Sequence, residues 1–317
     1  MTQSTNRAET ENRESLLLPG LDGANPLGFL AALGVLRTLS LHNASITLHW
    51  TPANGTWCAA LSAADAQLSK DDVLERLEAV LPAPDEDLCE RILKDLGKLP
   101  DNSRHSHFGG KANAATQMDR VYVDLLAAFS SDCVPADAIN QIQTVRRDYF
   151  LKNVESIVAR TDRYHLERSL FQTWDYADSL ENQSLHLDPS EDRRHAYQWN
   201  QPSGDPNRKK QGGMLGANRL AIEAIPLLVS VPINDRLNTL GFSGLKMGTV
   251  RWTWPIWTIP ATRHLVSSLL TISVIQQDEI RPHDVLKLHE MGVSAVFRSE
   301  LILVQQTKNF SPSRCIA

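Results

Sequence analysis

LDGANPLGFLAALGVLRTLSLH, residues 21–42, is the most strongly patterned segment of the chain. Asn25 is a good helix N-cap, and Pro26 follows at the first helical position, where a missing N–H does no harm. Large apolar residues then recur at helical spacing: Phe29, Leu30, Leu33 and Leu36. This pattern predicts a helix with one deeply buried face. Gly28 and Gly34 lower its intrinsic stability, and we interpret them as sites of close packing against a sheet.

Extended segments follow this helix and return later in the chain. Residues 45–50 (SITLHW) alternate between apolar and polar side chains, and a turn joins them to a returning strand that begins at Thr56. Residues 251–257 (RWTWPIW) alternate in the same way, and residues 293–307 form another predicted strand. Most of the remaining pattern is helical. The sequence therefore predicts an α+β fold that is mostly helical with small antiparallel β elements, namely an N-terminal helix plus hairpin and C-terminal strands.

The predicted domain organisation is simple. Residues 1–15 are polar and charged, which predicts a disordered tail. Residues 16–317 are expected to form a single α+β domain, within which residues 69–175 are a candidate helical subdomain. We find no internal repeat and no segment with the composition of a linker.

Composition excludes several classes of protein. The 317 residues are 42% hydrophobic and 22% charged, which is ordinary for a soluble globular protein. There is no run of about 18 apolar residues that would predict a transmembrane helix. No apolar segment follows a basic start as in a secretory signal. The four cysteines form no CxxC pair, which argues against a zinc ribbon. We therefore expect a cytoplasmic protein without membrane contact.

The charge is distributed unevenly along the chain. A formal net charge of −5 gives no general attraction for nucleic acid, but residues 193–251 contain nine basic and three acidic residues. A local basic region of this kind can bind a polyanion within an acidic protein. The residues that we expect to contact nucleic acid lie there: Arg193, Arg194, Arg208, Lys209, Lys210, Arg219 and Arg251.

The stretch HLDPSEDRRHAYQW, residues 186–199, has three alternative interpretations. Four of its side chains are metal-ligand types, although their spacing matches no standard metal signature: His186, Asp188, Asp192 and His195. Alternatively, Arg193 and Arg194 offer fork-shaped donors to a phosphate. In the third interpretation the stretch is a solvated turn whose acidic side chains pair with these arginines.

Two further segments have both a functional and a structural interpretation. Residues 207–219 (NRKKQGGMLGANR) place basic side chains beside glycines and before a helix N-terminus, which favours an anion, but they could equally be a solvated loop. They lack the residue order of a nucleotide P-loop, so ATP binding is not expected. Trp252, Trp254 and Trp257 beside Arg251 could stack on unpaired bases. The interpretation that we favour for these tryptophans is the hydrophobic core.

The case for an enzyme is weak. His105 and His107 lie two residues apart, but no second histidine pair accompanies them, and we interpret them as part of an exposed loop. The sequence contains no nucleophile elbow, no HExxH motif and no paired-carboxylate signature. We expect no catalytic residues, no metal and no cofactor.

The opening segment LDGANPLGFLAALGVLRTL resembles the start of proteins encoded in type I-G (formerly I-U) CRISPR loci. Those proteins begin with a similar Pro-Leu-Gly-Phe-Leu-Ala-Ala-Leu-Gly helix, followed by a hairpin that contains Trp. Three more blocks occur in the same order as in that family: GANRLAIEAIPLL at 216–228, TWPIWTIPATRHLVSSLL at 253–270 and LHEMGVSAVFRSE at 288–300. The nearest group is the Cas-three-extension family, which is similar to the large-subunit-like proteins of these loci. Residues 60–140 match no block.

The resemblance implies a non-catalytic component of a CRISPR effector that contacts guide RNA or target DNA and neighbouring subunits. For a large-subunit-like protein, the implied tasks are recognition of the short PAM motif or binding of the displaced DNA strand. Two alternatives remain open. One is a metal-dependent hydrolase or nuclease centred on the 186–195 stretch, and the other is a scaffold subunit that contacts only protein.

Overall fold

The structure is a computed structural model. It describes residues 14–53, 55–81, 124, 128, 140–145, 147–179, 183–191, 212–233, 236–244, 249–304 and 307–317.

The helices in the described part of the chain are α1 (Pro26–Ser40), α2 (Lys70–Val80), α6 (Arg147–Arg160), α7 (Arg163–Phe171), α10 (Leu215–Ala224), α11 (Arg263–Leu270) and α12 (Pro282–Glu290), with short 3-10 turns η3 (Pro189–Glu191), η4 (Ile225–Leu227) and η5 (Ser273–Gln276). The strands are β1 (Leu16–Asp22), β2 (Ile46–Ala53), β3 (Thr56–Ala63), β4 (Ser230–Ile233), β5 (Arg236–Thr239), β6 (Phe242–Ser243), β7 (Arg251–Trp257), β8 (Val293–Val304), β9 (Thr307–Phe310) and β10 (Arg314–Cys315).

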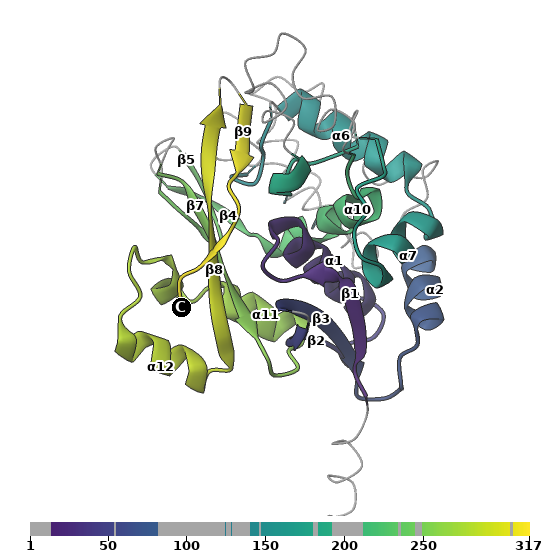
Figure 1. Ribbon diagram of the computed structural model, residues 1–317, viewed down its shortest axis with the longest axis horizontal. Helices are drawn as coiled ribbons and strands as arrows, with labels where there is room; N and C mark the ends of the chain where they lie inside the picture. The colour runs from purple at the N-terminus through teal and green to yellow at the C-terminus, as the bar shows by residue number, and fades with distance from the viewer. Residues whose placement is uncertain are drawn as a thin grey trace, which may run out of the picture.

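Helix α1 lies at the centre of the molecule, between the sheets and helices α2, α7 and α10 (Figure 1). It begins as predicted. The side chain of Asn25 accepts hydrogen bonds from the N–H groups of Leu27 at 2.8 Å and Gly28 at 3.2 Å, which satisfies two donors that have no partner within the helix. The sequence predicted one buried face, but in the structure every residue of α1 from Pro26 to Leu39 is buried. A helix that is buried on every side and apolar over most of its surface is expected in such a central position.

The described strands form antiparallel sheets, and the two larger sheets both contact α1 through Phe29. Within the described residues, the order of the first sheet is β1-β3-β2, and that of the second is β10-β8-β7-β6, with β9 also paired to β8. The hairpin β4-β5 stands apart. The α+β class is therefore confirmed. The mostly helical character is not confirmed, because β1, β4, β5, β6, β9 and β10 add strands to the predicted ones.

A cluster of aromatic side chains joins the two sheets to α1. Phe29 contacts Trp50 of β2 and Trp254 of β7, with ring centroids 5.8 and 5.7 Å apart. The indole N–H of Trp254 donates to the Gly23 carbonyl at 2.8 Å, and that of Trp257 donates to the Leu48 carbonyl at 2.7 Å. Buried indoles usually need such a partner, so these bonds fix the second sheet against the start of α1 and against β2.

Helix α10 packs directly on α1. A Cβ atom added to Gly34 would lie 1.8 Å from the Leu220 carbonyl oxygen of α10, so no side chain fits there. The interpretation that Gly34 faces a sheet is wrong, since its close neighbour is a helix. For Gly28 the interpretation holds, because its close neighbour is the backbone of Asp22, the last residue of β1 in the first sheet. Small residues at a helix crossing allow the two backbones to approach, and that crossing sets the middle layer of the fold.

Further helices and turns cover the outside of these layers. Helices α6 and α7 pack against α10, and α2 packs against both α1 and α7. On the other side, η5 and α12 lie against the second sheet in the connection between β7 and β8 (Figure 1). Glu14 is the first described residue, and its backbone carbonyl accepts a hydrogen bond from the side-chain amide of Gln67 at 2.7 Å. The rest of the predicted tail, residues 1–13, lies outside the described residues.

Candidate nucleic-acid interface

The described half of the 186–195 stretch is held against the start of α1. The Asp188 side chain is only 2% exposed. Its Oδ2 accepts bonds from the side-chain amide of Asn25 at 3.0 Å and from the Tyr176 hydroxyl at 2.9 Å, while its Oδ1 accepts from the Ser190 N–H at 2.7 Å. Asp188 therefore orients the residue that caps α1, and this contact joins two sequence motifs that are 163 residues apart.

The other members of the stretch contribute less to this picture. His186 has a positive φ of 56°, in the left-handed region, and its N–H donates to the Ser184 hydroxyl at 2.8 Å. Asp192, Arg193, Arg194 and His195 lie outside the described residues. In the part of the chain that the structure does describe, no group of three or more His, Cys, Asp or Glu side chains could hold a metal ion.

Replacing Asp188 with alanine should destabilise the protein by about 1–3 kcal/mol, because the partly buried donors of Asn25 and Tyr176 would lose their buried acceptor. Chemical denaturation followed by circular dichroism measures this loss. The control is Asp65→Ala, since Asp65 also accepts side-chain bonds from Asn43 and Ser45 but does so at an exposed site. Equal, small effects of both changes would contradict the capping role of Asp188.

The anion site predicted at the helix N-terminus near residues 207–219 is occupied by a carboxylate of the protein itself. The N–H of Leu215, the first residue of α10, donates to Asp178 Oδ2 at 2.7 Å. The same carboxylate is 2.6 Å from Nη2 of Arg168, a buried arginine. A carboxylate at a helix N-terminus interacts favourably with the helix dipole. The basic residues of the preceding loop, Arg208, Lys209 and Lys210, lie outside the described residues.

Arg219 does not lie on the surface. Its side chain is 2% exposed, and its Nη1 donates to Glu223 Oε1 at 2.7 Å, one turn further along α10. Glu223 Oε2 accepts a second bond, at 3.0 Å, from Arg37 of α1, which is 1% exposed. The expectation that Arg219 contacts nucleic acid is corrected accordingly: its guanidinium is used inside the fold. Burial lowers the pKa of Arg37, and the nearby carboxylates of Glu223 and Asp124 oppose that shift.

The tryptophans of β7 belong to the core. Trp252, Trp254 and Trp257 are fully buried, so the core interpretation is confirmed and they are not a stacking surface for bases. Because side chains alternate along a strand, Arg251 and Thr253 point to the face opposite Trp252 and Trp254, and a register irregularity between Ile256 and Trp257 interrupts the alternation before Trp257. Of the two predicted contact residues that the structure describes, Arg219 and Arg251, it is Arg251 that lies at the surface, with 30% of its side chain exposed.

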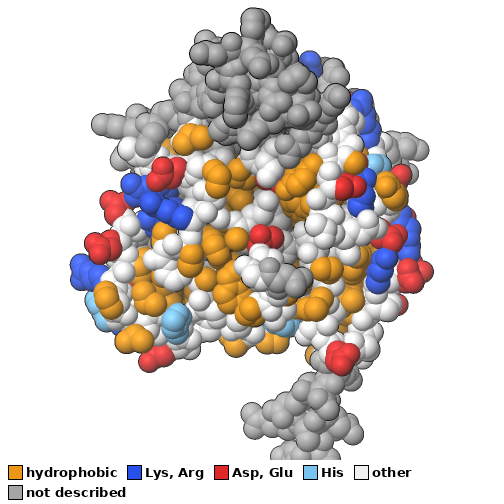
Figure 2. Space-filling view, in the orientation of Figure 1, with side chains coloured by type: hydrophobic (Ala, Val, Ile, Leu, Met, Phe, Trp, Pro, Cys, Tyr) orange, Lys and Arg blue, Asp and Glu red, His pale blue; other side chains and the backbone are white. Residues whose placement is uncertain are grey.

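Three arginines share the outer face of the second sheet, and we call them the arginine face: Arg251, Arg298 and Arg314. In the antiparallel register, Arg298 of β8 lies opposite Thr253 of β7 and opposite Arg314 of β10. Residues that lie opposite one another point to the same side of a sheet, so these side chains are neighbours. Figure 2 shows basic and acidic side chains side by side on this flank of the molecule, the side of β8 and α12.

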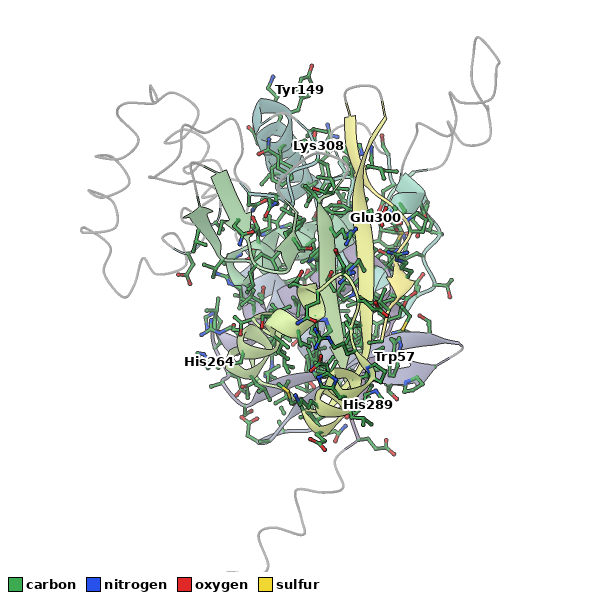
Figure 3. The ribbon with its side chains drawn as sticks, turned by 90° about the vertical axis from the view of Figure 1, so that its left-hand side faces the viewer. Trp57, Tyr149, His264, His289, Glu300 and Lys308 are labelled. Atoms are coloured by element: carbon green, nitrogen blue, oxygen red, sulfur yellow. The ribbon has the colours of Figure 1, made fainter. Side chains whose placement is uncertain are left out.

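Two carboxylates accompany the arginine face. Asp278 pairs with Arg251, and its side chain is 89% exposed. Glu300 lies opposite Arg251 in the register and is 3.5 Å from Arg314 Nη2. Figure 3 views the molecule from this side, and the labelled Glu300 lies part-way along β8, above α12. Three guanidinium groups and two carboxylates leave an excess of one positive charge.

Arg298 is the buried centre of the arginine face, with an exposed fraction of 1%. Its guanidinium donates to the carbonyls of Ile275 at 2.9 Å, Gln277 at 2.6 Å and Asp278 at 3.1 Å. Burial lowers the pKa of Arg298, and repulsion by Arg251 and Arg314 lowers it further. Arg298 therefore anchors the segment that carries Asp278, and it adds to the positive potential under the two exposed arginines.

Sequence reasoning missed Arg298 and Arg314. The signal for Arg298 was present, because Arg298 and Glu300 are the charged residues of this predicted strand and, two positions apart, they must share a face. Nothing in the sequence indicated that Arg314 would pair beside them.

Comparison with known proteins adds no identification: no protein-family model matches this sequence, and no curated protein has a detectable match to it. None of the helices in the described part of the chain has the length and hydrophobicity that a membrane span requires.

Proposed function

We propose that this protein is a non-catalytic, cytoplasmic component of a type I-G CRISPR–Cas antiviral effector, in which it contacts guide RNA or target DNA and neighbouring subunits. The sequence resemblance suggests this function. The four blocks that carry the resemblance belong to α1, α10, β7 with α11, and α12 with β8. These elements pack around one core, so the resemblance follows the framework of the fold.

The observation that carries the nucleic-acid part of the proposal is the arginine face. Guanidinium groups bind phosphate through paired, charge-assisted hydrogen bonds. Trp252 and Trp254 point to the opposite face, so the described residues of the arginine face offer no aromatic ring for a base. The face therefore suits a phosphodiester backbone rather than a particular sequence.

The metal-dependent alternative has less support. Asp188, its best-placed carboxylate, accepts three hydrogen bonds from the protein itself and caps the start of α1 through Asn25. A carboxylate in that position has a structural task. The scaffold alternative differs from the proposal in requiring no nucleic acid at all, so one binding experiment separates them.

Replacing Arg251 and Arg314 together with alanine should weaken the binding of a labelled single-stranded oligonucleotide. The logarithm of the binding constant should fall linearly with the logarithm of salt concentration. Its slope should become shallower by about 1.4 in the variant, since each phosphate contact with a single strand contributes about 0.7. Fluorescence anisotropy across a salt series measures both quantities.

The control removes two positive charges elsewhere, through Lys70→Ala and Arg163→Ala. These residues pair with Glu167 and Glu78 on α7 and α2, away from the second sheet. The control should keep the slope of the unmodified protein. Absence of binding by the unmodified protein at low salt would rule out the nucleic-acid role and favour the scaffold.

A further inference from the structure

We propose that Asp278 and Glu300 are built-in competitors for the arginine face, which make it selective for ligands that bring several phosphates at once. This inference rests on the proposed function, because it concerns the regulation of the same site. It assigns to the two carboxylates a role that the fold does not require of them, since both are surface residues.

Each of the two surface arginines, Arg251 and Arg314, already lies beside a carboxylate. Arg251 is bonded to Asp278, and Arg314 is 3.5 Å from Glu300. Glu300 also lies directly opposite Arg251 across the β7-β8 pair, so it is placed between the two arginines. A phosphate that approaches either guanidinium therefore competes with a carboxylate that is already there.

The competitor on Arg251 is held in position rather than free. Three backbone carbonyls of the segment 275–278 accept bonds from the buried Arg298. The backbone that carries Asp278 is therefore fixed to β8, while the carboxylate itself remains in solvent. Arg298 thus contributes positive charge beneath the site and also positions the group that occupies it.

The net free energy of binding should differ between a single phosphate and a polynucleotide. Exposed ion pairs contribute little net stability, so exchanging one carboxylate for one phosphate gives almost no gain. A polynucleotide offers neighbouring phosphates to both arginines, and it also releases counterions from its own atmosphere when it binds. Only the polymeric ligand gains enough to displace both carboxylates, and free phosphate or a mononucleotide does not.

Glu300→Gln and Asp278→Asn, singly and together, test this competition, since each keeps the shape of the side chain and removes its charge. Each change should tighten the binding of the single-stranded oligonucleotide about threefold, the size expected for releasing one exposed ion pair. The double variant should bind about tenfold more tightly if the two pairs act independently. In a direct titration, inorganic phosphate should also bind the double variant more tightly than it binds the unmodified protein.

The matched control is Glu78→Gln. Glu78 is partly exposed and pairs with an arginine, Arg163, at 2.7 Å, but it lies on α2. It changes the net charge by the same amount as either test variant and should alter binding much less. If Glu300→Gln and Asp278→Asn bind no more tightly than Glu78→Gln, the competitor role is refuted.

The failure of this inference can be told apart from failure of the proposed function. Loss of binding on replacing Arg251 and Arg314, without any gain from the carboxylate changes, would leave the proposed function standing and remove only the competition. If neither the unmodified protein nor the carboxylate variants bind at low salt, both proposals fall together.

Discussion

Replacing Gly34 with alanine should destabilise the protein by about 3 kcal/mol, although alanine is the better helix former by about 1 kcal/mol. The added Cβ atom would lie 1.8 Å from the Leu220 carbonyl oxygen, which belongs to the backbone of α10 and cannot rotate away. The two helices would have to separate, and the buried side chains around their crossing would lose contacts. A shift in the midpoint of urea denaturation, followed by circular dichroism, measures the effect.

The sign of the change is the informative part. If α1 contributed only its intrinsic helix stability, Gly34→Ala would stabilise the protein. The control is Gly55→Ala in the turn between β2 and β3. Gly55 has a φ of +79°, but nothing lies within 4 Å of its added Cβ atom, so only the backbone strain of about 1 kcal/mol is expected. A stabilised Gly34→Ala variant would show that α1 and α10 do not pack as closely as described.

Replacing Glu223 with glutamine should cost about 3–5 kcal/mol, because it leaves two buried arginines without their shared carboxylate. Arg37 and Arg219 each bond to a different oxygen of Glu223, and all three side chains are buried between α1 and α10. Desolvation already lowers the pKa of Arg37, and Glu223 is the largest influence that opposes this shift. Thermal unfolding of the variant should occur at a clearly lower temperature.

Glu167→Gln is the control for this prediction. Glu167 pairs with Lys70 at 2.6 Å, but both side chains are exposed to solvent by about a third or more, so the expected loss is below about 1 kcal/mol. Replacing the buried trio together with apolar residues of similar size should recover much of the stability. A Glu223→Gln variant as stable as the control would mean that solvent reaches these arginines.

Local signals were sufficient to predict the main helix and its start. The Asn25 side chain accepts hydrogen bonds from residues only two and three positions away, so the local sequence is enough to predict where α1 begins. The same holds for α2, where Ser69 and Asp72 form a capping box. The partner of Gly34 could not be predicted, because glycine indicates that something approaches closely and not what approaches.

Charge was the least reliable guide to the site. Arg219 was counted with the basic region, yet it lies four residues before Glu223, a spacing that brings the two side chains together on a helix. Considering Arg219 and Glu223 as an ion pair would have suggested that Arg219 has a structural role inside the fold. Strand β1 was also missed, because Pro19 and Gly20 predict a stop. The structure accommodates them in an edge strand with an irregular register between Leu18 and Asp22.

The central position of α1 has a consequence for how the chain is made. Its neighbours come from far along the polypeptide, for example the Trp254 indole on the Gly23 carbonyl, 231 residues apart. At about 5–20 residues per second, a ribosome needs roughly 10–50 s to synthesise the intervening chain. During that time β1, β2 and α2 can cover part of α1, but the sides that α10 and Trp254 will cover have no partner yet. The nascent protein is therefore a natural client for chaperones, and its native core closes only after β7 has emerged.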